Sequence, residues 1–62
     1  MDPYNEIERL LQEKREEAEK MKIRSFIFYL IEDQYNYQKS MLRLYDLIVV
    51  IASLKLALKS LN

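Results

Sequence analysis

The sequence predicts an all-α fold, a hairpin of two long helices. The 62 residues include no glycine and one proline, so little in the chain would break a helix. Apolar residues recur three and four positions apart in both halves, which is the spacing of one helix face. A polar segment, EDQYNYQKS over 32–40, separates these halves and is long enough to hold a turn.

The first helix is expected over about residues 3–34. Asp2 can cap it, because its carboxylate accepts a hydrogen bond from an unpaired backbone N–H, and Pro3 fits the first helical position. An apolar stripe with polar gaps at Lys14 and Glu17 then follows one face of the helix. Its members are Ile7, Leu10, Leu11, Ala18 and Met21.

The charged run of this helix predicts ion pairs along its surface. Oppositely charged side chains three or four positions apart stabilise a helix by about 0.2–0.5 kcal/mol per pair. The expected pairs are Glu6–Arg9, Glu16–Lys20, Glu17–Lys20 and Glu19–Lys22. Pairs of this kind are typical of a solvated helix surface rather than of a binding site.

The turn is expected at about residues 33–37. Without glycine it must rest on Asp33, Asn36 or Ser40, and Asn36 is the first choice because asparagine tolerates the left-handed conformation. The alternative is one long continuous helix, in a coiled-coil or domain-swapped assembly, because nothing in this segment forces the helix to break.

The second helix is expected over about residues 37–61. It contains a heptad seam of apolar residues at alternating three- and four-residue spacing: Leu44, Leu47, Ile51, Leu54, Leu58 and Leu61. A narrow polar strip on the far side consists of Lys39, Asp46, Ser53 and Ser60. Other apolar residues, among them Ile48, Val49 and Leu56, lie outside the seam, so the apolar surface is wider than one partner helix can cover.

This surplus predicts that the hairpin self-associates. A 62-residue chain buries a small core, and the absence of cysteine and histidine removes disulfides and the usual zinc sites as stabilisers. We expect an antiparallel four-helix bundle of two hairpins, in which the longer first helix overhangs with its charged end. The predicted interface is Ile27, Leu30, Leu44, Leu47, Ile48, Val49, Ile51, Leu54, Leu56, Leu58 and Leu61. The alternative partner is a different protein in a heteromeric complex.

The apolar segment of the second helix is too short to cross a membrane. Its longest uncharged run, residues 47–54, has eight residues, whereas a spanning helix needs about 20. The N-terminal residues MDPYNEIERL resemble neither a secretory signal nor a transit peptide. With no cysteine in the chain, we expect an intracellular, cytoplasmic protein.

The sequence contains no constellation of catalytic residues. There is no histidine, cysteine or glycine-rich phosphate loop, so we expect no enzyme activity, no metal and no cofactor. The predicted function is a protein–protein interaction module: an adaptor, a scaffold or an accessory subunit. The alternative is a small nucleic-acid-binding regulator. Its candidate contacts are the basic residues of the first helix and the tyrosines of the turn: Lys14, Arg15, Lys22, Arg24, Tyr35 and Tyr37.

Overall fold

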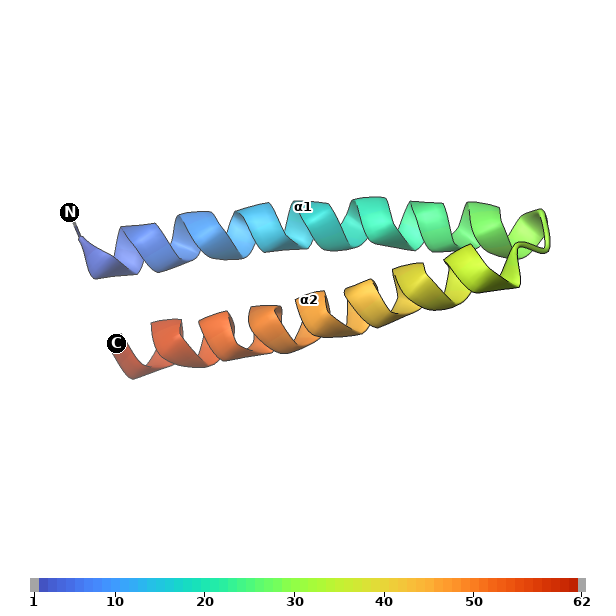
Figure 1. The fold of residues 1–62 in the computed structure, drawn as a ribbon. Helices are drawn as coiled ribbons and strands as arrows, with labels where there is room; N and C mark the ends of the chain where they lie inside the picture. Colours follow the sequence, from blue (N-terminus) through green and yellow to red (C-terminus); the bar gives the residue numbers. More distant parts are fainter. Residues whose placement is uncertain (1, 62) are drawn as a thin grey trace.

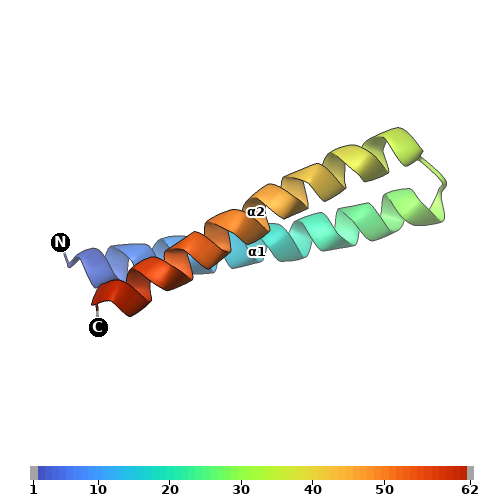
Figure 2. The ribbon, with the colours of Figure 1, turned by 90° about the horizontal axis from the view of Figure 1, so that it is seen from below.

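The computed structural model describes residues 2–61 as two helices joined by a short turn (Figure 1). Helix α1 spans Pro3–Leu30 and helix α2 spans Gln34–Leu61, and each has 28 residues. They run antiparallel, so the start of α1 and the end of α2 lie at the same end of the molecule (Figures 1 and 2). The predicted all-α hairpin is confirmed, and the alternative of one continuous helix is wrong.

Helix α1 begins as predicted from its capping residues. The Asp2 carboxylate accepts a hydrogen bond from the Tyr4 backbone N–H at 3.0 Å, and Pro3 occupies the first helical position. This cap satisfies one of the N–H groups that the first turn leaves unpaired, and proline there has no N–H to lose.

The turn lies earlier in the chain than predicted. Helix α1 ends at Leu30 rather than near residue 34, and α2 begins at Gln34 rather than near residue 37. The residue in the left-handed region is Glu32, with φ of 61°, and not Asn36, which lies inside α2.

Backbone hydrogen bonds explain why the helix stops at this point. The Glu32 N–H donates to the Tyr29 carbonyl at 3.2 Å, and the Asp33 N–H donates to the Phe28 carbonyl at 2.9 Å. This is the Schellman arrangement, which closes a helix C-terminus around one left-handed residue.

Asp33 then caps the second helix. Its carboxylate accepts from the Asn36 N–H at 3.2 Å and from the Asn36 side-chain amide at 2.7 Å. Because the turn occupies only residues 31–33, the two helices have equal lengths, so the predicted difference in length that suggested an overhang of α1 is wrong.

The two helices meet along a heptad seam. The α1 residues of this seam are buried or half-buried: Tyr4, Ile7, Leu11, Lys14, Ala18, Met21, Ser25 and Phe28. Those of α2 are also buried or half-buried: Tyr37, Ser40, Leu44, Leu47, Ile51, Leu54 and Leu58. The buried core is small: Leu11 and a cluster of Ala18, Leu44 and Leu47, with Met21, Met41 and Ile51 packed against the cluster. Leu47 is its most enclosed member, with 2% of its surface exposed.

A polar layer interrupts the seam near the turn. The Ser25 hydroxyl donates to Ser40 Oγ at 2.8 Å, and the Ser40 hydroxyl donates to the Tyr37 carbonyl at 2.9 Å. Both serines are buried, so these bonds satisfy polar groups that water does not reach. Their small side chains also allow the two helix backbones to approach closely at this level.

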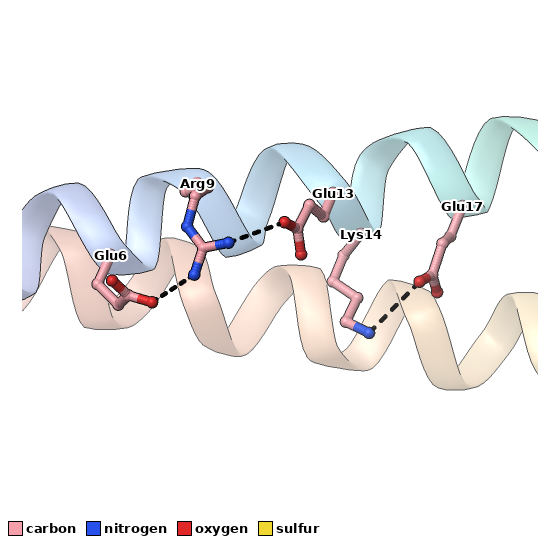
Figure 3. Close-up of polar contacts among 5 residues, drawn as sticks. All are labelled: Glu6, Arg9, Glu13, Lys14 and Glu17. Carbon is pink, nitrogen blue, oxygen red and sulfur yellow. Dashed lines mark hydrogen bonds and ion pairs between the residues drawn. The ribbon is translucent and has the colours of Figure 1, made fainter.

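Ion pairs line the charged half of α1. Figure 3 shows Arg9 between Glu6 and Glu13, and it forms an ion pair with each. The Arg9–Glu13 distance is 3.1 Å, and Lys14 contacts Glu17 at 3.6 Å. The hydrogen bond to Glu6, together with the charges of Glu6 and Glu13, raises the pKa of the Arg9 guanidinium above its ordinary value.

Two of the four predicted ion pairs form. Glu6–Arg9 and Glu19–Lys22 are confirmed, whereas Lys20 makes no ion pair with Glu16 or Glu17. Glu17 instead contacts Lys14 and, across the seam, Arg43 of α2 at 3.4 Å. Within residues 2–61, this last contact is the ion pair that joins the two helices.

Candidate interaction surface

Helix α2 carries a second apolar stripe on the side that faces away from α1. The stripe, here called the outer stripe, has the alternating three- and four-residue spacing of a heptad seam: Leu42, Tyr45, Val49, Ala52 and Leu56. Its large members are 66%, 63%, 64% and 65% exposed in chain order. Gln38 precedes the stripe and Lys59 follows it at the same spacing, so polar residues bound it at both ends.

Helix α1 exposes a smaller apolar patch near the turn. Its members are Ile23, Phe26, Ile27 and Leu30, and all four are exposed. They share one helix face, because they are three, four and seven positions apart. Before Ile23, the solvent-facing side of α1 is dominated by glutamate, lysine and arginine, so the patch does not extend along the helix.

The structure divides the predicted interface into two sets. Five of its residues belong to the seam that α1 covers within one chain, and they are buried or half-buried: Leu44, Leu47, Ile51, Leu54 and Leu58. Six are exposed and therefore open to a partner: Ile27, Leu30, Ile48, Val49, Leu56 and Leu61. The first set holds the hairpin together, and the second set lies on its outside.

Sequence reasoning missed four exposed residues that belong to these surfaces: Leu42, Tyr45, Ile23 and Phe26. A signal for the outer stripe was present, since Tyr45 and Ala52 complete the heptad spacing of Leu42, Val49 and Leu56. The signal is hard to recognise because the true seam of α2 has the same period and similar residues.

The basic residues proposed for nucleic-acid contact do not share one surface. Lys14 is a half-buried seam residue, while Arg15 and Lys22 follow seam residues and Arg24 precedes one. Helical geometry therefore places Arg15 and Lys22 on one flank of the hairpin and Arg24 on the other.

The two candidate tyrosines also differ in their surroundings. Tyr35 is exposed, and the Lys39 ammonium lies 5.1 Å from the centre of its ring. Tyr37 is half-buried, with its ring centre 5.9 Å from that of Tyr29. Tyr35 is therefore available to a ligand, whereas Tyr37 helps to close the turn end of the seam.

Arg24 belongs to a different basic group, which both helices form together. It lines a shallow groove of about 460 Å³ with Lys39 and Arg43 of α2. The groove lies on the flank where Glu17 and Arg43 form the ion pair between the helices. The contacts predicted from the sequence include Arg24 but not Lys39 or Arg43, because the register of the hairpin is what brings the three together.

Residues 2–61 lack two other kinds of feature, a cluster of metal-binding side chains and a membrane-spanning helix. No three histidine, cysteine, aspartate or glutamate side chains in this range lie close enough together to hold a metal ion. Neither described helix carries a stretch long and apolar enough to cross a membrane.

Comparisons with known proteins give no match to this chain, whether with protein-family models, curated proteins or solved structures. The outer stripe and the basic groove are therefore interpreted from their own residues.

Proposed function

We propose that this chain is a non-catalytic protein–protein interaction module that acts as a homodimer of helical hairpins, an adaptor, scaffold or accessory subunit. The observation that carries the proposal is the outer stripe of α2. It is a heptad seam without a partner, since α1 covers the opposite side of the same helix. Exposed apolar surface of this extent is typical of an interface.

The free energy that burial of the outer stripe would contribute is large for a chain of this size. Full burial of a leucine, valine or similar side chain is worth about 1.5–3 kcal/mol. A chain of 62 residues has a total stability of only about 3–9 kcal/mol, at about 0.05–0.15 kcal/mol per residue. Burying several residues of the outer stripe would therefore contribute a free energy comparable with the total stability expected for a chain of this size.

A second copy of the chain fits the stripe through its symmetry. In an antiparallel contact about a two-fold axis near Val49, the Leu42 end of one stripe meets the Leu56 end of the other. The polar residues Gln38 and Lys59 then remain at the rim of the contact. The two α2 helices form the centre of an antiparallel four-helix array, and the charged half of each α1 lies outside.

Sedimentation analysis tests the dimer. We expect the wild type to sediment as a folded dimer at micromolar concentration, and Val49→Lys to sediment as a monomer that keeps its helical circular dichroism. Gln12→Lys is the matched control, because it adds the same charge at an exposed site of α1, away from the outer stripe. This control is expected to remain a dimer.

A wild type that sediments as a folded monomer would contradict the proposal. The outer stripe would then be assigned to a different protein in a heteromeric complex. Substitution at Leu47 is unsuitable for this test, because a charge there would unfold the hairpin itself. A cytoplasmic location is part of the proposal, and the absence of cysteine from the sequence is consistent with it.

A further inference from the structure

Positive charge gathers in the groove between the turn-proximal halves of the two helices. Its basic lining residues are Arg24 of α1 and Lys39 and Arg43 of α2, and its apolar floor includes Met21, Ile27 and Phe28. No acidic side chain lines this groove. In a chain whose ten basic and ten acidic residues cancel, this is a local separation of charge.

The surroundings of the groove preserve that excess. A neighbouring hollow adds Lys20 and the carboxylate of Glu17. The Asp33 carboxylate, which accepts hydrogen bonds from the groove residue Asn36, is a second anion, so the region holds four cations and two anions. Glu17 is already engaged by Lys14 and Arg43. Among the described residues, Lys20, Arg24 and Lys39 make no ion pair, and their charges are therefore free to attract an anionic ligand.

An aromatic ring stands beside this positive surface. Tyr35 is 70% exposed and lies one helical turn before Lys39, whose ammonium is 5.1 Å from the centre of the ring. A basic groove with an exposed aromatic side chain at its edge is the arrangement that binds single-stranded nucleic acids, because cations hold the phosphates and the ring stacks on a base.

We propose that this groove binds single-stranded nucleic acid without sequence specificity, with phosphates held by Arg24, Lys39 and Arg43 and a base stacked on Tyr35. Nucleic acid is favoured over an acidic peptide by the exposed ring, which has no role in pairing with carboxylates. The groove is formed by both helices on a flank of the hairpin, whereas the outer stripe belongs to α2 alone.

Fluorescence anisotropy of labelled oligo(U) and oligo(dT) tests the proposal on the full chain. With about three phosphates neutralised, the logarithm of the affinity should fall with the logarithm of salt concentration with a slope of about −2. The doubly substituted variant Arg24→Gln/Lys39→Gln should lose about tenfold or more in affinity at low salt and show a shallower slope. Tyr35→Ser should lose about fivefold or more, because stacking is removed.

The matched control is Arg15→Gln/Lys22→Gln. It makes the same change in net charge on the opposite flank of the hairpin, so its affinity should stay within about twofold of the wild type if the groove is the site. Equal losses in the two double variants would overturn the proposal, because they would show that only overall charge matters.

Two further outcomes would also overturn it. The first is absence of oligonucleotide binding at low ionic strength. The second is binding of poly-glutamate in place of the oligonucleotides, which would assign the groove to an acidic protein segment. Sedimentation of every variant distinguishes failure of the groove proposal from failure of the dimer proposal. A variant that loses binding but remains dimeric concerns the groove alone. A monomeric wild type that binds RNA would contradict only the dimer.

Discussion

At the scale of single residues, Glu32 carries the backbone conformation that closes the hairpin. Its φ of 61° lies in the left-handed region, which costs an L-residue with a Cβ atom about 1–2 kcal/mol. The hydrogen bonds from Glu32 and Asp33 back to the last turn of α1 offset this cost. Glycine would adopt the same conformation without the steric penalty.

Glu32→Gly should therefore stabilise the protein. We expect the free energy of unfolding, measured by urea denaturation at fixed protein concentration, to rise by about 0.5–1 kcal/mol. Glu8→Gly, at an exposed site inside α1, is the matched control and should lower it by about 1 kcal/mol. A lower free energy of unfolding in Glu32→Gly would contradict this prediction, because it would show that the left-handed conformation of Glu32 does not destabilise the folded state.

The caps show which residues can be predicted from local rules. Asp2 and Pro3 could be read from the sequence, since an N-cap depends on its own side chain and the next few N–H groups. Glu32 could not, because glutamate has no preference for the left-handed region. Its conformation belongs to the Schellman turn, in which Glu32 and Asp33 donate to the carbonyls of the last turn of α1.

At the scale of the helices, the seam combines apolar layers with two polar positions. Lys14 lies in the seam and keeps its ammonium near Glu17 at the surface, so its alkyl chain is buried while its charge is not. Ser25 and Ser40 are both buried; Ser25 donates to Ser40, and Ser40 donates in turn to the Tyr37 carbonyl. The seam of α2 was predictable because each of its predicted members from Leu44 to Leu61 is apolar. That of α1 was predictable only in part: the apolar stripe included Ile7, Leu11, Ala18 and Met21, whereas the polar seam residue Ser25 gave no signal.

The serine pair should behave as a coupled unit. Ser40→Ala leaves the buried Ser25 hydroxyl without its acceptor, and we expect a loss of about 1–2 kcal/mol in the free energy of unfolding. Removing both hydroxyls in Ser25→Ala/Ser40→Ala should cost less than the sum of the single changes, by about 1 kcal/mol. Additive effects in this double-mutant cycle would mean that the hydrogen bond contributes nothing to stability.

At the scale of the whole molecule, the hairpin is a rod of 45 × 14 × 13 Å with chemically distinct sides. The outer stripe runs along α2, charged residues cover much of α1, and the basic groove lies on one flank near the turn. The sequence revealed that α2 has more apolar surface than one helix can cover. It could not show which residues α1 covers, since that depends on the register, nor could it show the groove, whose cations come from both helices.

Thermal unfolding should depend on protein concentration if the outer stripe is buried between copies. Because dimerisation stabilises the folded state by mass action, a tenfold increase in concentration should raise Tm by several degrees. In Val49→Lys, Tm should be lower and independent of concentration, whereas Gln12→Lys should follow the wild type. Differential scanning calorimetry at three concentrations measures this, and a constant wild-type Tm would contradict the dimer.

The position of the three-residue turn also has a consequence for how the chain folds. Closing a short loop costs little chain entropy, and contacts between residues near each other in sequence form early. Ser25 and Ser40 are the first buried residues on either side of the turn, and the Ala18, Leu44 and Leu47 core follows directly. The hairpin is therefore expected to zip from the turn toward its termini, which would present the outer stripe in a defined shape before two chains meet.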